Sequence, residues 1–281
     1  MKCYFNSCAQ AIEHTLQTKT YGLYYAEKAK SNQDIHVHDC SEIFLCLTNG
    51  NHFLIDGKVY TANKNDLFII SHLQAHKVAP CNFDNFIRFS LHVSPSFILS
   101  NSTASVDLSA CFYSDNKTDK ITLSDSEVES LISLFKKLEN YKEFGDEVYK
   151  NLSAVEILLF VNELIGVQTT KLSSQSNHPS LDRAIDYINE NYDKNLNLSI
   201  IAQNSYVSVN QLCSLFQTYL STTVIKYLTS LRITHAKKLL LSGKSVTETA
   251  FSCGFNDYAN FIRTFKQAVG VSPGKYTKKE G

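Results

Sequence analysis

Three histidines and one glutamate in the first third of the chain have a spacing that suits a divalent metal ion. His36, His38 and Glu42 stand at even-numbered positions, and His76 follows further along the chain. In an extended strand alternate side chains point to one face, so the first two histidines would share a face, with Glu42 on the same parity. Imidazole and carboxylate groups are common ligands of divalent metals. We expect these four side chains to converge.

This arrangement resembles the metal motif of the cupin fold, H-x-H-x3-E with a later histidine. The second motif of that fold is altered in this sequence. Asn65 stands where the fold usually has a glycine before Asp66, and Ser71 and His72 stand where a proline is usual. Three interpretations stay open: polar lining of an effector pocket, a bound divalent metal, or histidines satisfied within a core. The resemblance favours the effector pocket, so we predict no resident cofactor and keep the four residues as the candidate metal site.

Two further side chains are candidates for the same pocket. Arg88 stands among apolar strand residues, so it either extends its stem to solvent or lines the interior of a barrel. Tyr24 is one of two adjacent tyrosines, which line a pocket or pack in a core. The predicted effector site comprises Tyr24, His36, His38, Glu42, His76 and Arg88.

The last hundred residues contain one pattern written twice. A small residue precedes an apolar residue by five positions, and an apolar residue precedes an aromatic one by four. A helix-turn-helix needs such a pattern, because alanine lets two helices approach and an i/i+4 apolar pair faces the core. The first copy comprises Ala202, Val207, Ser208, Leu212 and Phe216, and the second comprises Ala250, Phe255, Asn256, Phe261 and Phe265.

Polar residues at the expected helix starts support this pattern. Ser208–Gln211 and Ser245–Glu248 predict capping boxes, and Asn256 is expected to cap the last recognition helix. Between the copies, Thr223–Leu241 predicts a single helix of about 28 Å. That length is close to the separation of successive major grooves on one DNA face, about 34 Å.

The C-terminal hundred residues resemble the AraC-type transcription regulators. The resemblance rests on Leu231-Arg232-Ile233, Cys253-Gly254-Phe255, Arg263-Thr264-Phe265-Lys266, Gly270-Val271-Ser272-Pro273 and Tyr276. It implies a domain of seven helices with two helix-turn-helix units joined by one long helix. The alternative is a helical bundle without a role in DNA binding.

The second unit carries the charged residues expected to meet DNA. Arg263 stands one turn into the recognition helix, where a guanidinium reaches guanine O6 and N7 or a phosphate. The alternative for Arg263 is a surface ion pair with Asp257 or Glu248. The predicted DNA-binding residues of both units are Asn210, Gln211, Ser214, Asn256, Tyr258, Ala259, Asn260, Arg263 and Lys266.

The first unit departs from the family pattern. Residues 195–225 include no charged residue, and Ser214 stands where arginine is usual. Tyr206 replaces the usual glycine of the turn. Neutral side chains can read bases through hydrogen bonds but cannot neutralise phosphates, so we expect this unit to add little salt-dependent affinity.

Charge and cysteine content narrow the class of protein. The formal net charge is zero, but residues 181–281 have 12 Lys and Arg against 7 Asp and Glu, whereas residues 1–180 have 15 against 20. A basic C-terminal part suits DNA at that end. The eight cysteines include no C-x-x-C, so we expect reduced thiols. We expect neither a signal peptide nor a membrane span, and hence a cytoplasmic protein.

The predicted fold class is multidomain α+β: an N-terminal cupin-like β-barrel (jelly roll) with flanking helices, then an all-α domain with two helix-turn-helix units. Short strands are expected at 43–47, 67–70 and 83–93, with a hairpin over 52–60 that turns at Asp56-Gly57. Residues 1–20 are expected to form an arm. The predicted domains are the barrel at 1–120, dimerisation helices at 121–168, a flexible linker at 169–178 and the DNA-binding domain at 179–281.

These features predict a sequence-specific transcription regulator that acts as an activator and responds to a small-molecule effector in the barrel. The resemblance implies a carbohydrate effector, promoter DNA, RNA polymerase and a second copy of the chain as partners, with no membrane and no catalytic residues. Two rival classes are a metal-dependent cupin enzyme with a DNA-binding tail and a repressor without a ligand.

Overall fold

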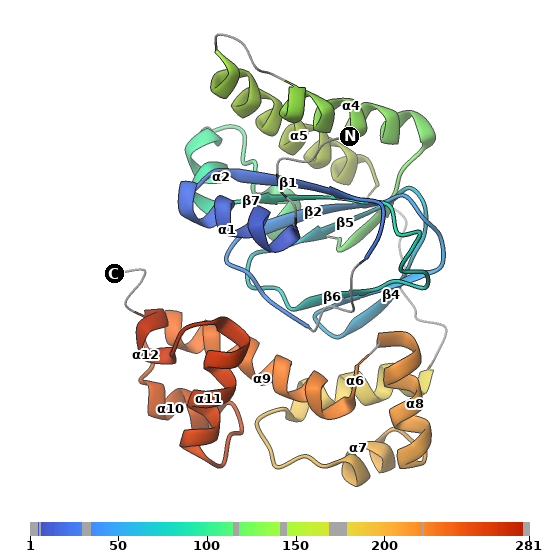
Figure 1. Cartoon of the computed structure of the whole chain (residues 1–281), viewed down its shortest axis with the longest axis vertical. Coiled ribbons are helices and arrows are strands. Elements are labelled where there is room, and N and C mark those ends of the chain that lie inside the picture. Colours follow the sequence, from blue (N-terminus) through green and yellow to red (C-terminus); the bar gives the residue numbers. More distant parts are fainter. Residues whose placement is uncertain are drawn as a thin grey trace.

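The chain folds into three layers in the computed structural model (Figure 1). Two sheets form the middle layer, two long helices cover one side, and a group of helices lies on the other. The structure describes residues 5, 7–29, 35–114, 118–140, 145–168, 179–220 and 222–277. The predicted linker at 169–178 lies outside the described residues. No helix within these ranges combines the length and apolar character needed to cross a bilayer.

The described strands form two antiparallel sheets, with the orders β1-β7-β2-β5-β8 and β4-β3-β6. Strands β2, β5 and β7 are buried along their whole length, although β2 includes Glu42 and β7 alternates polar with apolar residues. The strands are β1 (Tyr21–Ala26), β2 (Ser41–Cys46), β3 (Asn51–Ile55), β4 (Lys58–Ala62), β5 (Asp66–Ile70), β6 (His76–Ala79), β7 (Arg88–Val93) and β8 (Lys120–Thr122).

The N-terminal part differs from the sequence prediction in three places. The expected arm contains a helix, α1 (Cys8–Thr18), which Ser7 caps by accepting a bond from the Gln10 amide. The strand expected at 83–93 begins only at Arg88. Strand β8 crosses the predicted domain boundary at residue 120, because it pairs with β5 at the edge of the larger sheet. The hairpin turn at Asp56-Gly57 is confirmed, with φ of 42° and 86°.

Two long helices pack against each other over the five-stranded sheet. They are α4 (Asp125–Asn140) and α5 (Asp146–Gln168), and they share one apolar core with that sheet and with α2 (Pro95–Asn101) and α3 (Ala110–Tyr113). Phe135 of α4 stacks on Phe89 of β7, with ring centroids 5.0 Å apart. The other face of α5 leaves Val148, Leu152 and Leu159 exposed.

The C-terminal helices form two pairs on either side of one long helix, α9 (Val224–Leu241). The first pair is α7 (Leu198–Asn204) and α8 (Val209–Leu220), and the second is α10 (Val246–Ser252) and α11 (Tyr258–Val269). Helix α6 (Pro179–Asn191) packs with the first pair, and α12 (Pro273–Tyr276) packs with the second. The N-terminal half of α9 thereby completes the first core and its C-terminal half completes the second.

The helix caps explain where the paired helices begin. The capping box of Ser245 with Glu248 is present, and Ser208 exchanges the same two bonds with Gln211. The prediction that Asn256 caps α11 is wrong. Asp257 is the cap, because its carboxylate accepts from the amides of the next turn at 2.8 and 3.3 Å.

Candidate nucleic-acid interface and effector pocket

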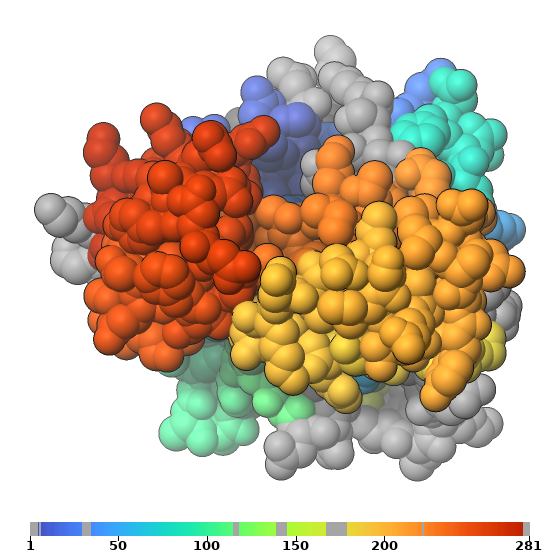
Figure 2. Space-filling view, turned by 90° about the horizontal axis from the view of Figure 1, so that it is seen from below, coloured from blue at the N-terminus to red at the C-terminus, as the bar shows by residue number. Residues whose placement is uncertain are grey.

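The residues predicted to contact DNA are all exposed in the folded chain. Helices α8 and α11 bury one apolar stripe each, carried by Leu212 and Phe216 in α8 and by Phe261 and Phe265 in α11. The opposite faces of these helices face solvent. The exposed set is Asn210, Gln211, Ser214, Asn256, Tyr258, Ala259, Asn260, Arg263 and Lys266. Both helix pairs contribute to the face of the molecule that lies away from the sheets (Figure 2).

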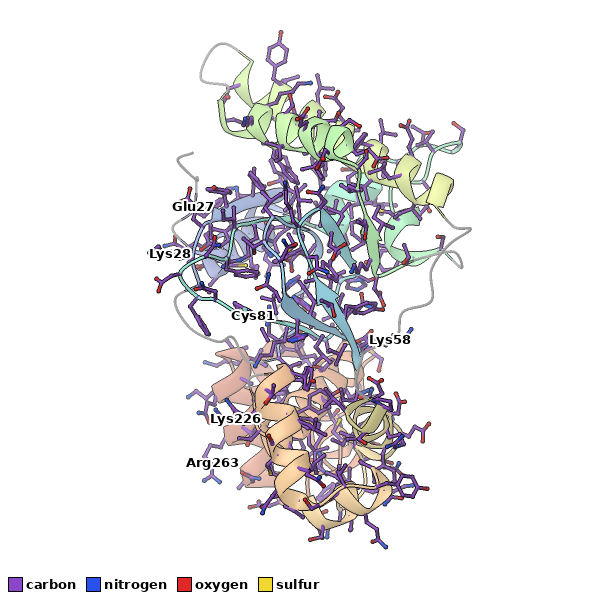
Figure 3. The ribbon with its side chains drawn as sticks, turned by 90° about the vertical axis from the view of Figure 1, so that its right-hand side faces the viewer. Glu27, Lys28, Lys58, Cys81, Lys226 and Arg263 are labelled. Carbon is purple, nitrogen blue, oxygen red and sulfur yellow. The ribbon has the colours of Figure 1, made fainter. Side chains whose placement is uncertain are left out.

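Arg263 points away from the helices into solvent (Figure 3). Its Nη2 donates to Oδ1 of Asn260 at 3.2 Å, one turn earlier on α11. The two acids considered as its partners are engaged elsewhere, because Asp257 caps α11 and Glu248 accepts bonds from Ser245. The guanidinium therefore lies beside a polar amide on an exposed helix face, as base recognition requires.

Other basic residues of the C-terminal part serve the fold. Arg232 donates to the carbonyls of Tyr192 and Lys194 at 2.8 and 2.7 Å, which fixes the loop before α7. Lys237 is only 5% exposed and lies against the segment that precedes β2. The excess of basic residues in the sequence therefore overstates the positive charge that the C-terminal part exposes, and Arg263 and Lys266 on α11 are among its exposed cations.

The histidines and the glutamate of the candidate effector site come together from three strands and one connecting segment. Glu42 lies on β2, directly opposite His92 of β7 in the register. His36 forms an isolated bridge with His76, the first residue of β6. His36, His38, Glu42, His76 and His92 are hereafter the His/Glu cluster. The expected convergence of the first four is observed, and their role as effector ligands stays a prediction.

The cluster is arranged around one carboxylate oxygen. Oε2 of Glu42 lies 3.2 Å from Nε2 of His38, 3.2 Å from Nε2 of His76 and 3.7 Å from Nε2 of His92. Burial alone would raise the pKa of Glu42, but the surrounding imidazoles hold that pKa well below its usual value. Burial also lowers the pKa of His92 to about 4, so this imidazole is neutral at pH 7. The cluster thus combines a buried carboxylate, Glu42, with a neutral imidazole, His92.

Backbone carbonyls orient two of these rings. Nδ1 of His38 lies 2.7 Å from the carbonyl of Cys40, and Nδ1 of His76 lies 2.9 Å from the carbonyl of Gln74. A carbonyl only accepts, so each Nδ1 carries the proton that it donates. The Nε2 atoms of both rings are thereby turned toward Glu42.

Arg88 is buried and lines a cavity beside the cluster rather than reaching solvent, which decides between the two alternatives for this residue. It is 8% exposed, and its Nη1 donates to the carbonyls of Phe86 and Lys28 at 3.0 and 3.2 Å. Tyr24 does not line the cavity, but its ring lies 5.6 Å from the Arg88 guanidinium. Burial lowers the pKa of Arg88, and the group stays charged in the physiological range.

The cavity beside the cluster is small. It measures about 20 Å³ and is lined by His36, Glu42, His76 and Arg88 among the predicted residues. Phe44 and Phe53 close it, with ring centroids 4.9 Å apart. A volume of about 10–15 Å³ on this measure holds one water, whereas pockets for organic ligands run to about 300–1,000 Å³.

Sequence reasoning missed His92, Ser90 and Cys8. His92 is fully buried, and Ser90 and Cys8 line the cavity. Alternate residues of a strand face the same side, so the strand that turns Arg88 toward the interior also turns Ser90 and His92 there. This alternation in the sequence could have predicted both residues. Cys8 lies on α1, a helix that the weak N-terminal pattern did not predict.

The segment that carries two cluster histidines also contacts the C-terminal helices. Asp39 pairs with Lys237 of α9 at 3.2 Å and accepts from the Tyr276 hydroxyl of α12 at 3.1 Å. Lys237 also donates to the carbonyl of Val37 at 3.4 Å. We call the contacts among Val37, Asp39, Lys237 and Tyr276 the polar latch. It joins the segment before β2 to α9 and to α12 of the second helix pair's core.

An apolar contact joins the three-stranded sheet to the first helix pair. Leu54 and Val59 of the β3–β4 hairpin share a core with helices α6 and α8. The ring of His52 lies 5.2 Å from that of Tyr219 on α8. Gly57 approaches Asn189 so closely that a Cβ at this position would lie 1.8 Å from the Asn189 amide nitrogen. The C-terminal helices are therefore docked on the smaller sheet.

Comparisons with known proteins agree with the helical geometry. Residues 201–279 match the family model described as "Helix-turn-helix domain". The melibiose operon regulatory protein of Escherichia coli K12 is 32% identical over 112 residues, which is 39% of this chain and 37% of that protein. The chain therefore matches well under half the length of that relative. The uncharacterised HTH-type regulator YdeC of Bacillus subtilis is 24% identical over 250 residues, 87% of this chain and 86% of that protein.

A solved structure gives a further match. A crystal structure from Chromobacterium violaceum, of a transcriptional regulator described among AraC-type DNA-binding domain-containing proteins, is 30% identical with a TM-score of 0.35. The match covers 36% of this chain and 91% of that one. The melibiose operon regulatory protein and YdeC are both named as regulators.

Proposed function

Because this chain carries the helix-turn-helix domain of the AraC-type transcription regulators, we propose that it binds promoter DNA in a sequence-specific manner and activates transcription with RNA polymerase. Helix pairs α7–α8 and α10–α11 are the two helix-turn-helix units, and α8 and α11 are the recognition helices. One observation supports this most: every predicted DNA-reading side chain is exposed on or beside these two helices. The rival enzyme class has less support, because the named relatives are regulators.

Selection from a random DNA library tests this proposal. The full-length chain should enrich one sequence motif, and a reporter placed behind that motif should rise in expression when the chain is present. Lys136→Ala, an exposed substitution on α4, serves as the matched control and should enrich the same motif. Recovery of only unenriched DNA by the wild-type chain would contradict the proposal.

We propose that the barrel is the sensor of this regulator and that the His/Glu cluster receives the effector. The cluster is buried, charged and placed beside the contacts to the DNA-binding domain. A sugar does not fit the 20 Å³ cavity of this conformation, since a pocket for an organic ligand is at least about ten times larger. The cavity therefore favours an effector much smaller than a carbohydrate.

The exposed apolar residues of α5 support a homodimer as the functional form. Val148 and Leu152 are 61% and 59% exposed, on a helix whose opposite face is fully buried. Large apolar side chains gathered on one helix face are typical of an interaction surface. A second copy of this chain would bring two DNA-binding domains to one promoter and raise affinity through effective concentration.

Replacing Leu152 with arginine should convert the dimer to a monomer. Two arginines brought to one apolar contact would be desolvated without partners, a cost of several kcal/mol. Light scattering on the full-length protein at tens of micromolar should give twice the chain mass for wild type and the chain mass for Leu152→Arg. Lys136→Ala should remain dimeric. A monomeric wild-type chain at this concentration would disprove the dimer.

A further inference from the structure

We propose that the groove between α4 and α5 binds a basic amphipathic helix of a second protein. The groove has a volume of about 740 Å³, and the two helices lie on the side of the sheets opposite the C-terminal helices (Figure 1). The inference goes beyond the proposed function, because it assigns a protein partner to a surface away from the effector pocket and the DNA contacts. A helix bound there would leave both recognition helices free.

The floor of the groove is apolar. It is formed by Leu134 of α4 and by Leu159 and Phe160 of α5. Leu134 is 7% exposed and Phe160 is partly buried, whereas Leu159 is 39% exposed. An exposed apolar side chain beside buried ones offers area that a partner helix can remove from water, as in the helix-in-groove mode of recognition.

The α4 side of the groove is made of small residues. Ser126, Ser130 and Ser133 line it, and spacings of four and three residues place them on one helix face. Such short side chains let a third helix approach to about 8–10 Å between axes. The Ser130 hydroxyl donates to the carbonyl of Ser126 at 2.9 Å, so it stays satisfied when a partner covers it. The groove therefore suits a helix.

The charges at the groove select a basic partner. Glu129, Glu156 and Glu163 line it, and no described residue that lines it is basic. Glu156 pairs with Lys137 at 3.1 Å. Glu129 and Glu163 have no ion-pair partner among the residues that the structure describes. Lysine or arginine side chains on the flanks of a partner helix would pair with these two carboxylates.

The same charges argue against two other occupants. A second copy that met this one groove to groove would bring three carboxylates from each chain together, and like charges across an interface disfavour such a contact. Nucleic acid is excluded because its phosphates carry the same sign. Val148 and Leu152, the α5 residues proposed for the dimer, do not line the groove. The dimer and the bound helix thus use different parts of α5.

Fluorescence polarisation with a synthetic peptide tests the groove on the full-length chain. The labelled peptide is a helix of about 18 residues with leucines at i, i+3, i+4 and i+7 on one face and lysines on both flanks. One peptide should bind per chain, and added salt should weaken the binding. A second peptide with glutamate at every lysine position should bind at least about tenfold more weakly.

Changes in the groove should weaken binding of the basic peptide. Glu129→Gln combined with Glu163→Gln should lower the affinity about fivefold, because two ion-pair partners are lost. Ser133→Arg should lower it at least about tenfold, because a long cation fills the groove and repels the lysines. Glu13→Gln combined with Glu147→Gln removes the same charge from exposed positions outside the groove and should bind as wild type does. Circular dichroism checks the fold of each variant.

Three results would overturn the groove as a docking site. The first is a wild-type chain that does not bind the basic peptide. The second is an equal loss from the two double variants, which would show attraction to negative charge in general. The third is loss of the dimer in Ser133→Arg by light scattering, which would show that a second copy occupies the groove.

DNA selection separates this inference from the proposed function. Ser133→Arg should enrich the same DNA motif as wild type, because the groove lies far from both recognition helices (Figure 1). Peptide binding that depends on the groove, in a chain that selects no DNA sequence, would support the docking site and overturn the proposed function. Selection of a motif by a chain that does not bind the peptide would overturn the docking site alone.

Discussion

Replacing Asp39 with alanine should destabilise the docked arrangement by about 3 kcal/mol, the range for removing one partner of a buried ion pair. The side chain of Lys237 is 6% exposed, and Asp39 is its charged partner. Tyr276 would lose its acceptor in the same change. Urea unfolding followed by circular dichroism should show the C-terminal helices unfolding at lower denaturant concentration than in wild type.

Two controls isolate the latch from a general effect of losing an acid. Asp84→Ala removes the partner of Lys28 in a pair whose side chains are 88% and 67% exposed, so it should cost at most about 1 kcal/mol. Lys237→Met combined with Asp39→Ala should restore most of the stability, because no charge then remains buried. A loss from Asp39→Ala no greater than that from Asp84→Ala would show that the latch contributes little.

Replacing Arg263 with alanine should lower the affinity for the selected DNA by about 1–3 kcal/mol, which is about 5- to 150-fold. Arg263 is the guanidinium on the exposed face of α11, and α8 carries no charged residue. Ser214→Ala should cost about 1 kcal/mol or less, because a neutral hydroxyl loses one modest hydrogen bond. Gel-shift titrations at two salt concentrations measure both losses.

The salt dependence distinguishes the roles of the two recognition helices. Ser214→Arg should raise non-specific affinity and steepen the salt dependence by at most about one phosphate contact. Lys136→Ala, far from both helices in the sequence, should change neither value. Equal losses from Ser214→Ala and Arg263→Ala would mean that the first unit carries a full share of the affinity.

Local sequence signals predicted the elements that are fixed by neighbouring residues. The capping box of Ser245 with Glu248 and the turn at Asp56-Gly57 are such signals, because their bonds and φ angles involve only a few consecutive positions. The helix over 224–241 was equally clear from its apolar residues and its stop at Ser242-Gly243. Helix α1 was not, because its few apolar residues give a weak helical pattern and it is held by packing on β1 and β7.

The candidate sites were predictable to different degrees. Residues on α8 and α11 follow helical register, so the exposed faces could be derived once the helices were placed. The size of the cavity and the latch between Asp39 and Lys237 depend on tertiary packing, which no local pattern encodes. Asn256 and Asp257 both suit a cap, and only the final turn geometry selected Asp257.

Hydroxyl-radical footprinting on the selected DNA tests the central claim, that each chain reads DNA through both recognition helices. Helix α9 has 18 residues and a length of about 27 Å, so it places the two units near successive major grooves, about 34 Å apart. Each chain should protect two sites about one helical turn apart on one DNA face. Protection at a single groove per chain would contradict binding through both helix pairs.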